Sequence, residues 1–450
     1  MKMSDMDRQK RFGTGSRGRL FGIICVVVLI KSVLAAITPL SGDFINIAYC
    51  AVWASQGGRF QGPYTFSVNL IGLFYQLWLA IPVDHQWIYL GYKFIASPSA
   101  FLLVFILKLP LLIADLLTAL LIYRLVLLLR PDQRIARFAL LAWLLNPYLT
   151  VIVEMDGTMD IVSTFLVVLA CYHFIRGKYG FSGISLAVAT VARFYPIVLF
   201  PLFIIILLRE RKVRNLLVSI GSYLIPLALV LILLVARYGV GILNEIYKIP
   251  VGGNREFIWF FGFRPNAASG SEMEISSVMT ILTILALLML RVWKTDKALV
   301  LDAILITLLT FLGLSHFNRY YTIWVVPFLT LSLARNWSSS YRKAYAFLFA
   351  LFFISASVYN FAYWWCSSLF FIYEFTPLIS ELTVLMRTLG GMLRLGDLGT
   401  TFSQSMLAAA CIIYSTVVAL LDTLRVRREN FLPQGWKRLC TRSAPGWEPT

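Results

Sequence analysis

Residues 99–129 read SAFLLVFILKLPLLIADLLTALLIYRLVLLL, and this stretch decides the fold class. Only Lys108, Asp115 and Arg124 carry a charge within it. A helix needs about 20 apolar residues to cross a bilayer, so this stretch can span one as a single α-helix. Apolar runs of this kind recur from Phe21 to Leu424. The sequence therefore predicts an all-α polytopic membrane protein, because a β-barrel would show short alternating segments instead.

The composition of the 450-residue chain excludes the common soluble classes. Hydrophobic residues make up 59% and charged residues 14%, whereas about one quarter of a soluble chain is charged. Disorder, a collagen-like fibre and a disulfide scaffold are excluded by the same figures. The six cysteines show no CxxC spacing, and most lie in or beside apolar runs, which predicts thiols. We expect one membrane domain, 20–424, between basic cytoplasmic ends at 1–19 and 425–450.

We predict about 12 membrane segments, some of them re-entrant. Their approximate bounds are 20–38, 99–129, 138–152, 160–175, 181–192, 195–208, 215–236, 276–290, 298–314, 320–334, 344–361 and 406–424.

The net charge of +18 reflects membrane topology and not nucleic-acid binding, because the basic residues cluster at the ends of apolar runs. With the N-terminus in the cytoplasm, the cytoplasmic stretches hold 27 of the 40 Lys and Arg residues, and the outer stretches hold 10. This asymmetry predicts that both termini are cytoplasmic.

Two regions deviate from simple crossings. The region 39–98 is predicted to be one long outer loop with an interfacial or re-entrant helix near 64–82, anchored at the interface by Trp78, Trp87 and Tyr89. The region 181–208 has basic clusters on both sides, so an even number of crossings is needed. Pro196 interrupts it, which predicts two short segments that meet on the outer side, as a pair of spans or a re-entrant hairpin.

Several ionisable residues share the outer face in this topology. They are Asp43 after the first span, Glu154, Asp156 and Asp160 around one turn, Arg193 at the tip of the broken pair, and His316 and Arg319 before a later span. Charged groups in or near a membrane are costly, so their positions indicate a functional site. Carboxylates supply a base, and cations hold an anion.

Other charges need partners inside the bundle. Lys108 and Asp115 lie two turns apart on one helix, too distant to bond directly, so each is expected to make its own interhelical contact. Lys31 in the first span is expected to make a buried polar contact. We assign no metal ligand or cofactor, although Glu154, Asp156 and Asp160 leave a hard cation such as Mg²⁺ or Mn²⁺ open.

Four sequence motifs, taken together, resemble those of the GT-C superfamily of membrane glycosyltransferases. Within this superfamily, the resemblance is to the branch that includes GPI mannosyltransferase I. The motifs are Gly42–Asp43, the run 108–117 (KLPLLIADLL), Leu144–Pro147 with the Gly157–Asp160 turn, and Arg193–Pro196 with the run 318–327 (NRYYTIWVVP).

The resemblance implies particular roles. Asp43 matches the first-loop acid that acts as the catalytic base, although several relatives have two acids there and this chain has Asp43 with Asn46. Asp160 matches an acid that lines the active site. Arg193 stands where many relatives carry Lys.

We therefore predict an inverting transfer of a monosaccharide, with mannose as first choice, from a polyprenyl- or dolichyl-phosphate donor to a lipid, glycan or protein acceptor at the extracytoplasmic face. Asp43 is the predicted base, and the donor phosphate is assigned to Arg193, His316 and Arg319. Asp156 and Asp160 are assigned to substrate or acceptor binding. The alternatives are a lipid-linked saccharide flippase or ion-coupled transporter, and an inactive GT-C subunit of a glycosylation complex. The membrane would be the plasma membrane of a prokaryote or the endoplasmic reticulum of a eukaryote.

The predicted topology can be tested with two single cysteines. Ser55→Cys should react with an impermeant thiol reagent on intact cells, and Asn430→Cys should react only after permeabilisation, because the basic tail stays in the cytoplasm. Equal labelling of the two variants from outside would exclude this topology.

Overall fold

The computed structural model describes residues 5–38, 42–55, 65–82, 89–90, 93–94, 98–193, 195–240, 297–314 and 319–335, with single positions at 343, 346 and 350. The predicted segments 276–290, 344–361 (apart from positions 346 and 350) and 406–424 lie outside these residues, as do Trp87, His316 and the tail 425–450.

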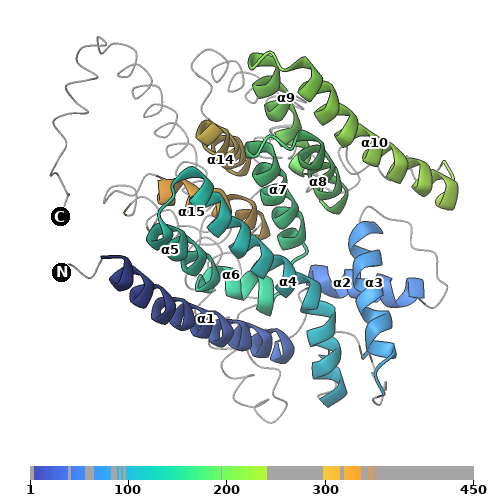
Figure 1. The fold of residues 1–450 in the computed structure, drawn as a ribbon. Helices are drawn as coiled ribbons and strands as arrows, with labels where there is room; N and C mark the ends of the chain where they lie inside the picture. Colours follow the sequence, from blue (N-terminus) through green and yellow to red (C-terminus); the bar gives the residue numbers. More distant parts are fainter. Residues whose placement is uncertain are drawn as a thin grey trace, which may run out of the picture.

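The described chain is almost entirely helical, which confirms the predicted fold class (Figure 1). The α-helices are α1 Asp5–Ile37, α2 Gly42–Ser55, α3 Thr65–Leu79, α4 Pro98–Leu129, α5 Gln133–Leu144, α6 Pro147–Leu149, α7 Asp160–Ile175, α8 Tyr179–Ala192, α9 Phe200–Arg209, α10 Val213–Tyr238, α14 Lys297–Leu314 and α15 Thr322–Arg335. A π-helix, η1, covers Thr150–Met155, and 3₁₀ turns cover Tyr195–Leu199 (η2) and Arg319–Tyr321 (η3). Strands β1 Tyr89–Leu90 and β2 Lys93–Phe94 pair antiparallel, with Tyr89 opposite Phe94.

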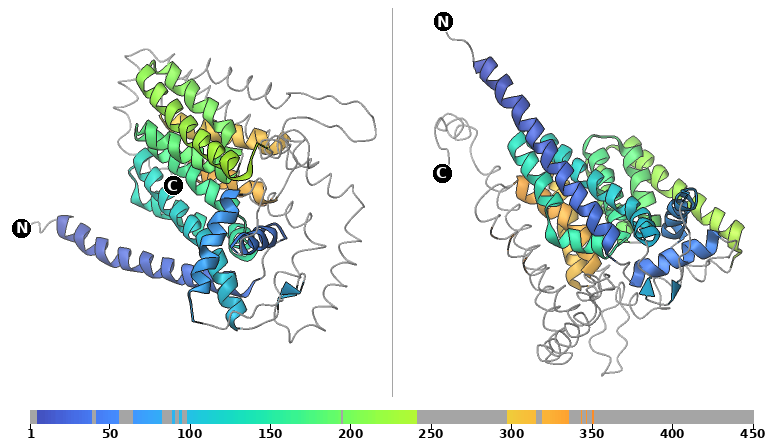
Figure 2. Two further views of the ribbon diagram at one scale, coloured as in Figure 1. Left: turned by 90° about the vertical axis from the view of Figure 1, so that its right-hand side faces the viewer. Right: turned by 90° about the horizontal axis from the view of Figure 1, so that it is seen from below.

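Four stretches of the described chain are long and apolar enough to cross a membrane: Leu20–Ile37, Phe101–Leu129, Gln133–Met155 and Val213–Arg237. Shorter apolar helices, among them α7, α8 and α15, pack around them. The first long stretch is only part of α1, which begins at Asp5, within the predicted basic end. In both views of Figure 2 the N-terminal part of α1 extends past the other helices.

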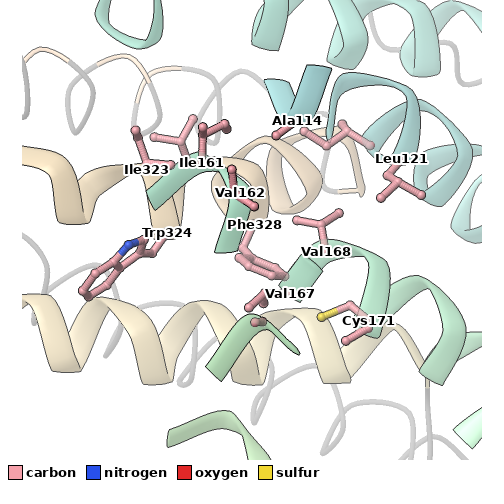
Figure 3. Close-up of a cluster of buried hydrophobic side chains, with 14 of the residues drawn as sticks. Ala114, Leu121, Ile161, Val162, Val167, Val168, Cys171, Ile323, Trp324 and Phe328 are labelled. Carbon is pink, nitrogen blue, oxygen red and sulfur yellow. The ribbon is translucent and has the colours of Figure 1, made fainter. Parts of the chain in front are cut away.

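The core of the bundle forms where α4, α7 and α15 meet. Figure 3 shows Ala114 and Leu121 of α4, Val168 of α7 and Phe328 of α15 in one apolar cluster. Leu121 is 8% exposed, and each of the other three residues is at most 4% exposed. Such burial of aliphatic and aromatic side chains supplies close packing between the three helices.

Helices α7 to α10 alternate in direction, as the positions of the basic clusters predict. Side-chain hydrogen bonds from Ser163 to the Ala189 carbonyl and from Ser182 to the Ala170 carbonyl show that α7 and α8 are antiparallel. Helices α8 and α10 run parallel, because Thr190 meets Tyr223 while Gly183 lies against Ser219. The η2–α9 segment connects the end of α8 to the start of α10 and so runs back in the opposite direction.

This arrangement separates the two ends of the bundle chemically. The basic turn at 176–178 joins α7 and α8, whose opposite ends carry Asp160 and Arg193. The stretch 209–214 lies beside this turn, because α8 and α10 run parallel. The stretch 130–137 begins α5, whose far end leads through η1 to Asp160. The predicted break at Arg193–Pro196 is present as the η2 turn, at the opposite end.

The first loop contains more structure than the sequence predicted. Helix α3 matches the expected interfacial or re-entrant helix, but α2 was not predicted and begins at Gly42. The prediction that Trp78 anchors at the membrane interface is wrong. Its indole is 1% exposed and stacks on Tyr75 with ring centroids 5.6 Å apart, so it packs inside the protein.

Close contact between α8 and α10 depends on Gly183. A Cβ atom at this position would lie 2.8 Å from the Ser219 carbonyl oxygen and 3.1 Å from Ser222 Cβ. We expect Gly183→Ala to destabilise the protein by about 1–3 kcal/mol, as overpacking does, and to lower its melting temperature in detergent. Gly180→Ala is the control, because its Cβ would lie 3.5 Å from the nearest side-chain atom. Equal melting temperatures for the two variants would contradict this packing.

Candidate functional site

Three helix ends bring polar groups together at the end of the bundle opposite the basic turns. Asp160 is the first residue of α7, Arg193 follows the last residue of α8, and Trp324 lies in the first turn of α15. The sequence predicted that Asp160 and Arg193 share this end, and their direct contact places them in one cluster.

Asp160 is the centre of this group, which we call the Asp160 cluster: Asp160, Thr158, Arg193 and Trp324. Arg193 Nε lies 3.3 Å from Asp160 Oδ1, and Trp324 Nε1 donates to the same oxygen at 3.1 Å. The Thr158 hydroxyl donates to Asp160 Oδ2 at 2.8 Å. The Asp160 side chain is 4% exposed and that of Arg193 18%. The carboxylate therefore orients Arg193, whose side chain remains partly exposed at this end of the bundle.

Aromatic rings support the Asp160 cluster from one side. The Trp324 ring lies between Tyr195, with centroids 3.9 Å apart, and Tyr321, with centroids 4.2 Å apart. The Tyr195 hydroxyl is 3.3 Å from the Thr164 hydroxyl. Stacking of this kind fixes the indole, and with it the N–H that reaches Asp160.

The segment that leads to Asp160 begins at the Asn146–Pro147 motif noted in the sequence. The predicted segment 138–152 is interrupted, because α5 ends at Leu144 and Asn146 caps a new start by accepting from the N–H groups of Tyr148 and Leu149. Pro147 fits the first helical position, where no N–H is required. The chain then continues as the π-helix η1, in which Asp156 N–H donates to the Val151 carbonyl.

Gly157 ends this segment with φ +76°, in the left-handed region that favours glycine. A Cβ atom here would lie 3.3 Å from Lys108 Cε and 3.5 Å from the Phe44 ring. The start of α2 therefore packs directly against the turn that leads to Asp160.

A second charged group lies deeper in the bundle. Lys31 of α1 donates to Asp115 of α4 at 2.8 Å and to Glu154 of η1 at 3.0 Å, and Trp143 donates to the other Asp115 oxygen at 2.8 Å. The side chains of Lys31, Asp115 and Glu154 are at most 3% exposed. This is the buried polar contact expected for Lys31, and it pairs Glu154 with a lysine of the first span.

Lys108 makes a separate contact, as expected from its spacing to Asp115. Its ammonium donates to the carbonyls of Glu154, Met155 and Thr38 and to the Thr38 hydroxyl, at distances from 2.8 to 3.1 Å. Its side chain is completely buried.

Among the remaining predicted site residues, the structure describes the side chain of Asp156 but not those of Asp43 and Arg319. Asp156 is 2% exposed and precedes Gly157, whose Cβ position lies 3.3 Å from Lys108 Cε. Asp43 is the second residue of α2, and Arg319 begins η3, but neither side chain is among those described.

The carboxylates at 154, 156 and 160 do not form a shared cation site. Glu154 faces Lys31 and Asp160 faces Arg193. In the described ranges, no three His, Cys, Asp or Glu side chains are grouped closely enough to hold a metal ion.

Sequence reasoning missed Trp324 as a partner of Asp160. Trp324 lies inside the motif 318–327. A buried indole N–H in an apolar helix needs a hydrogen-bond acceptor. That requirement was the available signal, but the sequence offered several acids as partners.

Comparisons with known proteins give a family match over part of the chain. The model of the family "GPI transamidase subunit PIG-U" matches residues 85–245, which is less than half of the chain. The match is to PIG-U and does not support the narrower resemblance to GPI mannosyltransferase I. No similar chain was found among curated proteins.

Among solved structures, ArnT from Cupriavidus metallidurans bound to undecaprenyl phosphate is similar, with a TM-score of 0.51 at 14% identity, over 92% of this chain and 78% of ArnT. Its apo form gives a TM-score of 0.48 at 15% identity, over 91% and 77%. The chain is an integral membrane protein that shares its fold with ArnT, in agreement with the predicted GT-C-like fold class.

The group around Lys31 gives a direct test of buried charge compensation. Lys31→Met should destabilise the protein by about 3–5 kcal/mol, because it leaves the Asp115 and Glu154 carboxylates buried without their cation. Lys212→Met is the control, since Lys212 is 43% exposed and pairs with Glu210 near the surface. Melting temperatures in detergent measure both effects. Adding Asp115→Asn and Glu154→Gln to Lys31→Met should restore part of the loss, and no restoration would contradict the charge explanation.

Proposed function

We propose that this chain is an inverting glycosyltransferase that moves a monosaccharide, with mannose as first choice, from a polyprenyl- or dolichyl-phosphate donor to a lipid, glycan or protein acceptor. The reaction takes place at the extracytoplasmic face, with both termini in the cytoplasm. The fold is consistent with this class, and ArnT, which shares the fold, binds undecaprenyl phosphate in its crystal structure.

The observation that carries the proposal is the ion pair between Arg193 and Asp160 at the end of the bundle. A departing lipid phosphate needs a positive charge whose orientation is fixed before the reaction. Asp160 holds the Nε edge of the guanidinium at 3.3 Å, and the arginine keeps 18% of its side chain exposed. We assign the donor phosphate to Arg193, with His316 and Arg319 as further cations, and we assign Asp160 the task of orienting Arg193.

The acceptor hydroxyl needs a base, and we assign that role to Asp43. Phe44, the next residue, packs against Gly157 in the turn before Asp160, so the backbone at position 43 lies near the Asp160 cluster. The carboxylate would take the hydroxyl proton while the oxygen attacks the anomeric carbon and the lipid phosphate leaves. Asp156, close to Lys108, is assigned to acceptor binding.

A second candidate is a GT-C-fold subunit that binds a lipid-linked glycan without transferring sugar. The match of residues 85–245 favours it, because the matched family is described as a subunit, "GPI transamidase subunit PIG-U". In that case the same arginine would hold a lipid phosphate, and the partners would include other subunits of a complex. The membrane for this candidate would be the endoplasmic reticulum of a eukaryote, one of the two membranes that the sequence left open.

The two candidates differ in the effect of Asp43→Asn. The purified chain is incubated with a panel of lipid-phosphate sugars and the acceptor pool is analysed by mass spectrometry. If Asp43 is the base, kcat should fall by about two to four orders of magnitude, the range for loss of a general base, while donor KM changes little. Asp132→Asn is the control, because Asp132 caps α5 at the opposite end and Asn caps equally well.

Arg193→Lys in the same assay reports on the donor phosphate. It should raise donor KM, since lysine keeps the charge but loses the planar fork. Wild-type protein that binds lipid phosphate through Arg193 and transfers no sugar from any donor would favour the subunit. An Asp43→Asn variant as active as wild type would exclude Asp43 as the base.

A further inference from the structure

Lys108 is a charged side chain that the proposed chemistry does not use directly. Its ammonium has three N–H donors, and four oxygen acceptors lie within 3.1 Å of it: the Thr38 carbonyl and hydroxyl, and the carbonyls of Glu154 and Met155. The donors are therefore directed at oxygens of the protein itself.

These oxygens belong to two segments that are far from Lys108 in the sequence. Thr38 follows the last turn of α1, five positions before Asp43. Glu154 and Met155 end η1, six and five positions before Asp160, respectively. One ammonium on α4 thus joins the segment that leads to the proposed base and the segment that leads to the Asp160 cluster.

The electrostatics of this contact are favourable. Carbonyls at the end of a helix have no partner within the helix and carry partial negative charge. Lys108 meets such carbonyls at the ends of both α1 and η1. Inside an apolar bundle these charge–dipole interactions are only weakly screened, so they are stronger than at a surface.

Packing restrains the same region. The Lys108 side chain and the Phe44 ring both lie against Gly157, where a Cβ atom would be 3.3 Å from Lys108 Cε and 3.5 Å from the Phe44 ring. Phe44 is 1% exposed. The aliphatic part of Lys108 and the ring of Phe44 thus both pack against the turn at Gly157.

We propose that Lys108 is a positioning residue, which sets the start of the first loop, and with it Asp43, at a fixed place relative to the turn that carries Asp160. This inference rests on the proposed function, because it assigns Lys108 a role between base and phosphate site. It predicts that Lys108 acts on the rate of transfer and does not bind the donor phosphate.

The test compares the full-length wild type with Lys108→Met by hydrogen–deuterium exchange in lipid nanodiscs and by sugar-transfer kinetics. Exchange in segments 38–55 and 150–160 should become faster by about 10- to 100-fold, as expected from the loss of hydrogen bonds to a charged group. Exchange in α8 and α10 should not change. For transfer, kcat should fall by a similar factor, and donor KM should stay within about twofold. Lys212→Met, at the surface, is the matched lysine control.

Two results would overturn the proposal: unchanged exchange in both segments, or a raised donor KM with kcat preserved, which would make Lys108 a phosphate ligand. Should Lys108→Met fail to fold, Lys108→Gln decides, because its shorter, uncharged amide has two N–H donors in place of three. It should give faster exchange in the same two segments, and no change there would refute the inference. A wild type that transfers no sugar refutes the proposed function, while the exchange data still decide whether Lys108 joins the two segments.

Discussion

Compensation of buried charge is the constraint on which this bundle depends. A lysine inside apolar helices is tolerated only if oxygen atoms surround its ammonium, and a carboxylate only if donors surround it. Lys31 satisfies both needs by joining Asp115 and Glu154, so that α1, α4 and η1 must meet at one level. Lys108 repeats the principle closer to the end of the bundle, with carbonyls in place of carboxylates.

These contacts give the site its rigidity. The segment from Asn146 to Asp160 changes from a helical turn to a π-helix and then to a left-handed conformation at Gly157. Lys31 binds the Glu154 side chain of this segment, and Lys108 binds the Glu154 and Met155 carbonyls. The segment can therefore present Asp160 to Arg193 and Trp324 in one geometry.

Much of the local structure follows from local sequence. The predicted segment 160–175 coincides with α7, since an acid at the start and a basic turn at the end bound an apolar run. The break at Arg193–Pro196 follows from proline, which interrupts helical hydrogen bonds. The first loop was less predictable. Helix α2 lacks a long apolar run, and Trp78 packs against Tyr75 inside the fold instead of lying at the interface.

The sequence by itself determined the membrane class, the basic end of the bundle and the helix breaks, because hydrophobicity, charge and proline act through neighbouring residues. Only the tertiary structure decided which charges pair. Lys31 binds partners 84 and 123 residues away, and Asp160 receives the indole of a residue 164 positions later. Several acids and bases have compatible chemistry, so the choice among them depends on how the helices pack. That packing is set by apolar surfaces distributed over the whole bundle.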